Sequence, residues 1–120
     1  GVLSQMDMGT LLDYCAIQLN GEKAGGKEAV ININFTDTKE KVMLMLKNGV
    51  LNHRLGSQDK KADLTMEIAK MDFVKLFFGR TDLQTLRKTN KVKTTGDTKA
   101  IDMIRSACEP ADPNFNIVLP

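Results

Sequence analysis

The chain has 120 residues, a length that suits one domain, and it can bury about two thirds of the surface that its unfolded form exposes. Its 17 basic and 15 acidic residues are mixed along the sequence and give a net charge of +2, which disfavours binding to nucleic acid or to an anionic membrane. No apolar run reaches the ~18 residues of a membrane-spanning helix, and the first residues lack the basic start and apolar stretch of a signal peptide.

The first segment, residues 4–20, predicts an amphipathic helix that ends at the stop signal Asn20-Gly21. The apolar stripe of this helix consists of Met8, Leu11, Leu12, Cys15, Ala16 and Leu19. Residues 23–27 contain a Gly-Gly pair and predict a flexible turn. Residues 29–35 then alternate isoleucine and phenylalanine with asparagine, which predicts a strand with one buried face.

Residues 41–55, KVMLMLKNGVLNHRL, predict two strands joined by a tight hairpin turn at the Asn-Gly pair. The first of these strands is apolar on both faces, because Met43 and Met45 alternate with valine and leucine. A strand with one face in water should be apolar on one face only. We therefore expect the methionine face to be half covered by the stems of its flanking lysines, or to dock on another domain.

The second half of the chain predicts one more run of strand and helix signals. A polar loop over residues 56–63 precedes a fourth strand, in which Leu64, Met66 and Ile68 alternate with polar residues. The remaining elements are a helix that begins at Asp72, a short helix capped by Asp82, a weak strand over 91–96 and a last helix capped by Asp97. This order predicts an α+β domain, with a five-stranded, mainly antiparallel sheet and helices layered on one face.

The sequence contains no constellation of catalytic or metal-binding residues. Its single histidine, His53, is too little for a zinc hydrolase site and is expected to have a structural or surface role. Cys15 and Cys108 fall on helix stripes and are interpreted as two separate buried thiols, with a disulfide between them as the less favoured alternative. None of the serines has the context of a nucleophile elbow.

What remains is an excess of soft apolar side chains, namely seven methionines and a cluster of phenylalanines over residues 73–78. Methionine is unbranched and polarisable, so a cavity lined with it can adapt to alkyl chains of varied length. For any one of these residues, packing in the core is the more ordinary explanation.

Residues 11–54 and 62–79 resemble the C-terminal domain of bacterial alkyl sulfatases, which belongs to the sterol carrier protein-2-like superfamily. Further matching features are the hairpin over 46–51, the strand start over 62–65, the Thr-Gly-Asp before the last helix, and Phe115–Val118 with Pro120. The resemblance covers nearly the whole chain, and no matching motif is catalytic.

This resemblance implies an apolar tunnel between the sheet and the helices, of the kind that holds lipids and fatty acyl chains. It also implies that zinc, which activates water, belongs to a metallo-β-lactamase-like domain earlier in the polypeptide, so no cofactor is expected in this chain. We therefore expect residues 1–120 to form one accessory domain of a longer alkyl sulfatase. A periplasmic or secreted location is an expectation from the family alone.

The sequence thus predicts a non-catalytic domain that binds a long alkyl or lipid chain beside the catalytic domain of its parent polypeptide. The expected tunnel residues are Leu44, Met66, Phe73, Phe77, Met103 and Ile104. Phe115 or Ile117 would add a contact from the tail, and Arg54 or a lysine near the mouth would read a sulfate or carboxylate head. The alternative is a structural domain with a filled core that packs on its parent, or forms a homodimer, through the face of Met43 and Met45.

Overall fold

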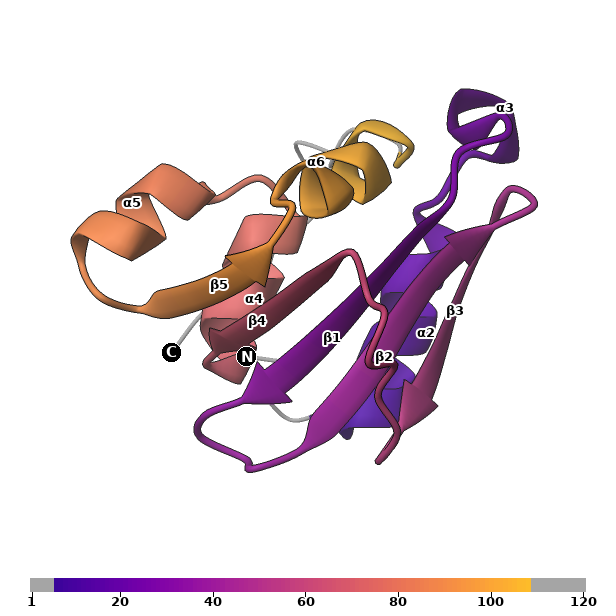
Figure 1. Cartoon of the computed structure of the whole chain (residues 1–120). Helices are drawn as coiled ribbons and strands as arrows, with labels where there is room; N and C mark the ends of the chain where they lie inside the picture. The colour runs from indigo at the N-terminus through magenta and orange to yellow at the C-terminus, as the bar shows by residue number, and fades with distance from the viewer. Residues whose placement is uncertain (1–5, 109–120) are drawn as a thin grey trace.

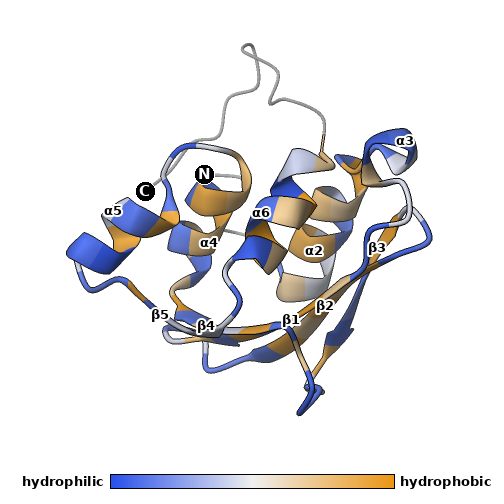
Figure 2. Cartoon of the chain, turned by 45° about the horizontal axis from the view of Figure 1, so that its top comes forward, coloured by the Kyte–Doolittle hydropathy of each residue, from blue (hydrophilic) through white to orange (hydrophobic). Residues whose placement is uncertain are grey.

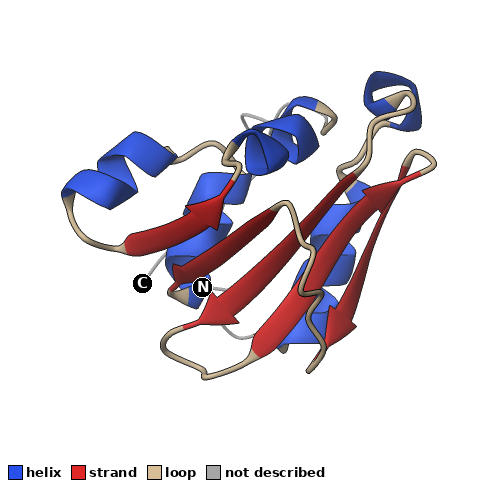
Figure 3. Ribbon diagram, in the orientation of Figure 1, coloured by secondary structure: helices blue, strands red, loops and turns tan. Residues whose placement is uncertain are grey.

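The computed structural model describes residues 6–108 and shows a sheet with helices on one side (Figures 1 and 3). The helices are α2 (Met8–Ile17), α3 (Gly21–Ala24), α4 (Lys70–Phe77), α5 (Leu83–Lys88) and α6 (Lys99–Ser106). The strands are β1 (Ala29–Phe35), β2 (Lys41–Lys47), β3 (Val50–Leu55), β4 (Leu64–Ile68) and β5 (Val92–Gly96). They form one five-stranded sheet in the order β3-β2-β1-β4-β5, parallel between β1 and β4 and antiparallel elsewhere. The predicted fold class is confirmed.

The helices form a second layer on one face of the sheet, as Figure 2 shows from the side. Helix α6 packs on β1, the central strand, and α2 packs on the edge strand β3. Every strand turns alternate residues toward this layer, and among the described residues these positions carry most of the hydrophobic core. The core therefore lies between the sheet and the helices.

The first helix is shorter than the sequence predicts. It begins after Asp7, whose carboxylate accepts a hydrogen bond from the backbone N–H of Thr10 at 2.8 Å, and it ends at Ile17. The predicted stop signal instead begins another helix, because the Asn20 side chain accepts a bond from the backbone N–H of Glu22 at 2.9 Å and so caps α3. The turn predicted over residues 23–27 is thus helical in its first part.

The two aspartates that were expected to cap helices each bond to the start of one. Asp82 and Asp97 accept bonds from backbone N–H groups at the starts of α5 and α6, at 2.7 and 2.9 Å. The predicted start of a helix at Asp72 is two residues late, because α4 begins at Lys70 and Asp72 lies inside its first turn. The side chain that meets the backbone N–H of Lys70, at 3.1 Å, is that of Asp37 in the turn between β1 and β2. This contact ties the beginning of α4 to the sheet.

The hairpin of β2 and β3 forms as predicted, with positive φ angles of 54° at Asn48 and 72° at Gly49. Its register places Leu44 opposite His53 on the helix side of the sheet, and Met43 opposite Arg54 on the other side. The apolar character of β2 on both parities therefore reflects two different surroundings.

The face of the sheet away from the helices is partly covered by residues 56–63, which cross it between β3 and β4 (Figure 1). The Asn32 side chain holds this loop, since its Nδ2 donates to the backbone oxygen of Asp59 at 2.7 Å and its Oδ1 accepts from the backbone N–H of Asp59 at 3.0 Å. Gln58 adds a bond from its Nε2 to Asn34 Oδ1 at 3.0 Å.

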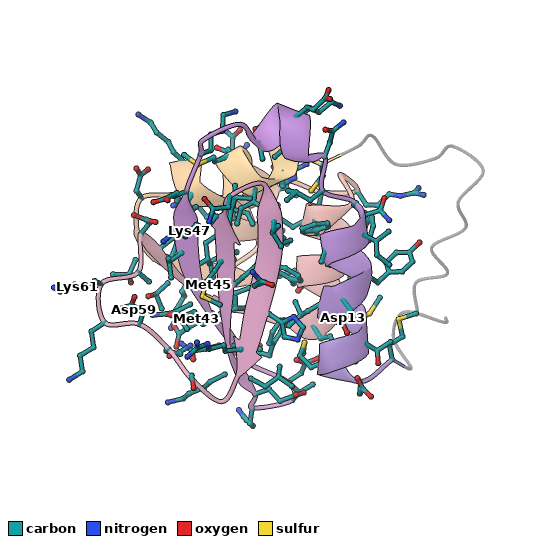
Figure 4. All side chains as sticks on the ribbon, turned by 90° about the vertical axis from the view of Figure 1, so that its right-hand side faces the viewer. Asp13, Met43, Met45, Lys47, Asp59 and Lys61 are labelled. Carbon is teal, nitrogen blue, oxygen red and sulfur yellow. The ribbon has the colours of Figure 1, made fainter. Side chains whose placement is uncertain are left out.

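Met43 is the strand partner of Asn32 and lies on the face that this loop crosses (Figure 4). Only 8% of Met43 is exposed, whereas Met45 is half-buried and Lys47 is exposed. Met43 is thus buried within this chain, without another domain, on the face that residues 56–63 cross (Figure 1).

Candidate ligand-binding site

The structure brings the six predicted tunnel residues into one apolar layer. Leu44 and Met66 come from β2 and β4, and both point toward the helices from either side of β1. The other four come from α4 and α6 and are Phe73, Phe77, Met103 and Ile104. All six belong to the main hydrophobic cluster or pack against it, and only Met103 is partly exposed.

A row of aromatic rings runs through this layer from the sheet to α2. Phe35 of β1 meets Phe73 edge-on at a centroid distance of 5.7 Å, and Phe73 lies 6.0 Å from Phe77. Phe77 then contacts Phe78 at 5.3 Å, and Phe78 contacts Tyr14 at 5.8 Å. The sequence did not single out Phe35 or Tyr14 for the site, although Phe35 stands on the buried parity of its strand.

The interior of this layer offers contact but no acid–base chemistry. Within residues 6–108, Asn32 is the one buried polar or charged residue, and it lies on the opposite face of the sheet. A guest between the sheet and the helices would therefore meet hydrocarbon, thioether and aromatic surfaces, which suit an apolar chain.

Three surface hollows lie outside this layer. One, of about 340 Å³, is lined by Phe35, the turn after it and Glu67, and a second, of about 300 Å³, lies between that turn and β5. The third, of about 610 Å³, is lined by charged residues of α5 and α6, including Asp82 and Arg87. None of these three includes a predicted tunnel residue.

The candidate for reading an anionic head changes with the structure. Arg54 is exposed and starts from the face of β3 that points away from the helices, so it does not stand beside the predicted tunnel. Phe115 and Ile117, the expected contacts from the tail, lie outside the described residues. Arg105 of α6 is half-buried beside Ile104, and no pattern in the sequence marked it as a candidate.

Both cysteines are free thiols. Burial raises the pKa of Cys15 far above its ordinary value, and the nearby Cys108 adds to this effect. Burial also raises the pKa of Cys108 to about 11, although Arg105 and Lys23 act in the opposite direction. Neither thiol carries the lowered pKa of a catalytic nucleophile.

His53 faces α2, where its Nδ1 lies 3.7 Å from Oδ1 of Asp13. Because Asp13 is largely exposed, this contact links α2 to β3 at the surface and not inside the apolar layer. In the part of the chain that the structure describes, no three histidine, cysteine or acidic side chains converge as a metal site would require. No helix among the described residues is long and apolar enough to cross a membrane.

Comparison with known proteins gives a match over the whole chain. A family model described as "Alkyl sulfatase C-terminal" matches residues 1–120. The linear primary-alkylsulfatase of a Pseudomonas species is 33% identical over 115 residues, which are 96% of this chain and 17% of that protein. The chain therefore spans about a sixth of the length of this relative.

Solved structures agree with this match. The chain resembles part of the stereoselective inverting sec-alkylsulfatase Pisa1 from a Pseudomonas species, with a TM-score of 0.85 and 33% identity. The similarity covers 95% of this chain and 18% of that one. Sterol carrier protein-2 like-3 from Aedes aegypti is 17% identical with a TM-score of 0.56, over 83% of this chain and 94% of that one. This second likeness concerns the fold alone.

Proposed function

This chain belongs to the alkyl sulfatase C-terminal family, and from that premise we propose that it is a non-catalytic domain that takes up the alkyl tail of an amphiphile. The tail lies between the sheet and helices α4 and α6. The domain recruits substrate for a separate zinc-dependent, metallo-β-lactamase-like domain of the same polypeptide, where the sulfate ester is hydrolysed.

The observation that carries this proposal is the convergence of soft apolar side chains from both layers. Met66 from the sheet and Phe73 from α4 belong to one apolar cluster, and Met103 from α6 packs against it. The buried members of this cluster carry no charge. These side chains are buried apart from the partly exposed Met103, so entry of a tail requires α4 or α6 to move away from the sheet. The methionines can repack around a chain at little cost because they lack a branched β-carbon.

The free energy gained by burying an alkyl tail can drive such an opening. Burial of a methylene group contributes about 0.8 kcal/mol, so a twelve-carbon chain supplies roughly 10 kcal/mol before the costs of association and opening. Association alone costs about 4 kcal/mol at the low end of its range. The remainder corresponds to binding in the micromolar to millimolar range, which suits a domain that must also release its ligand.

The test is displacement of a fluorescent fatty acid by decyl sulfate, kept below its micelle concentration. We expect saturable binding, and we expect Met103→Gln to weaken it several-fold because an amide replaces a thioether at the edge of the layer. Met45→Gln is the matched control, since Met45 is also a half-buried methionine but lies on the opposite face of the sheet. Equal affinity of the two variants would show that the ligand does not bind in this layer.

A second candidate function follows from the burial of most of the predicted site. Leu44, Met66, Phe73 and Ile104 are 0% exposed, as in a core whose only role is to hold a domain together. In that case the domain would pack against its parent or a second copy. Absence of saturable binding, together with a dimer that depends on concentration in analytical ultracentrifugation, would favour this function.

A further inference from the structure

Arg105 occupies a distinctive place at the end of α6. It follows Ile104 of the apolar layer, it is half-buried, and it faces the end of α4. A Cβ at position 79 would stand 3.7 Å from Arg105 Nη2. Gly79 has a φ of 76° and so belongs at a helix end, and its missing side chain also leaves room beside the guanidinium.

The guanidinium carries a donor that no described residue satisfies. Arg105 Nε is buried and has no hydrogen-bond partner within residues 6–108. A buried N–H without an acceptor destabilises a protein, and a charged donor does so more than a neutral one. The Nε–H and one Nη–H of arginine also form the parallel pair that grips a carboxylate or a sulfate.

Among the described residues, the acidic side chains near Arg105 do not supply this acceptor. Asp82 lies close enough to influence Arg105 electrostatically, but its carboxylate accepts the backbone N–H of Thr85 at 2.7 Å and caps α5. Asp102, on the same helix as Arg105, is exposed and lines the hollow between α5 and α6. Arg105 thus presents a cation at one edge of an apolar layer.

We propose that Arg105 binds the anionic head of the amphiphile whose tail lies between the sheet and helices α4 and α6. This assignment rests on the proposed function, because it needs a tail in that layer. The head is recognised as an oxyanion, either a sulfate ester or a carboxylate, by the paired Nε–H and Nη–H donors. Head and tail together orient the ligand, with its charged end at Gly79 and its chain along Phe77 and Phe73.

The experiment compares three probes with the same ten-carbon chain, namely decyl sulfate, decanoate and 1-decanol. Each displaces a fluorescent fatty acid from the full chain and from the variants Arg105→Gln, Arg105→Lys and Arg54→Gln. The last is the matched control, because Arg54 is exposed on the opposite face of the sheet. Since a hydrogen bond to a charged group is worth one to two decades in affinity, we expect Arg105→Gln to weaken the two anionic probes by about ten- to hundredfold.

The outcomes separate the two proposals. In support, 1-decanol binds all variants alike, Arg105→Lys recovers only part of the loss because it lacks the paired donors, and the Nε–H proton resonance of Arg105 shifts on addition of decyl sulfate. A loss for decyl sulfate but not decanoate would identify the sulfate ester as the preferred head, and the reverse would identify the carboxylate. If Arg105→Gln binds every probe as the unmodified chain does, the assignment of Arg105 is wrong while tail binding stands. If no probe binds, both the proposed tail binding and the assignment of Arg105 are wrong.

Discussion

Substitution of Asn32 tests how the second face of the sheet is covered. Asn32 is 6% exposed and exchanges two hydrogen bonds with the backbone of Asp59, at 2.7 and 3.0 Å. An intramolecular hydrogen bond contributes about 1 kcal/mol net, so we expect Asn32→Ala to lower the free energy of unfolding by about 2 kcal/mol. The freed groups of Asp59 can turn to water because that residue is exposed, which limits the cost to this value.

Urea unfolding measures the effect. With a slope of about 2 kcal/mol per molar urea, the midpoint should fall by about 1 M with the slope unchanged. Asn52→Ala is the control, because Asn52 is an exposed asparagine on the same face of the sheet. In Asn32→Ala the loop should also leave Met43 more open, so that peroxide oxidises this methionine faster. An equal midpoint for the two variants would refute the idea that the Asn32 side chain fixes the loop.

Two further predictions concern the backbone and the thiols. Gly96→Ala should lower the free energy of unfolding by at least about 2 kcal/mol, because Gly96 has a φ of 106° and a Cβ there would stand 2.5 Å from the backbone oxygen of Asp63. Gly26→Ala is the control, because the space around Gly26 is open, and it should leave the urea midpoint unchanged or raised. Folding raises the pKa of Cys108 from 9.0 to about 11, so this thiol stabilises the fold below pH 9, and its contribution should be lost as pH rises toward 11. The urea midpoint of Cys108→Ala should therefore fall less over that pH range than the midpoint of the unmodified chain. At neutral pH, a thiol reagent added to the folded protein should label Cys15 hardly at all.

Local patterns in the sequence were enough to predict the order of elements. The alternation of residues 29–35, the Asn-Gly turn of the hairpin and the spacing of Phe73 and Phe77 each depend on neighbours within a few residues, and each is found in the structure. The residues at which the helices begin and end were predicted less accurately than the order of the elements. Asn20 can end one helix or begin another, and only the position of the following backbone decides between these roles.

Contacts between distant segments could not be predicted from local patterns. The parallel pairing of β1 with β4 and the cover of Met43 both follow from the path of residues 56–63 across the sheet. In the sequence this segment is only a polar loop, and nothing local shows that Asp59 will meet Asn32. The face of Arg54, by contrast, follows from the predicted hairpin, because the two-residue turn pairs Arg54 with Met43 on the side away from the helices. The place of Arg105 beside Gly79 depends on helix packing, which no local pattern shows.

The two ends of α4 differ in a way that bears on how a tail could enter. The beginning is tied to other elements, since Asp37 accepts the backbone N–H of Lys70 and Lys70 Nζ donates to the backbone oxygen of Met6. At the other end, the backbone N–H groups of Gly79 and Arg80 bond back to carbonyl oxygens of the same helix, and the ring of Phe78 contacts the rings of Tyr14 and Phe77. Ring contacts can slide, whereas hydrogen bonds between elements must break. We therefore expect the layer to part at the end of α4 that faces Arg105, which is also where an anionic head would remain in reach of water.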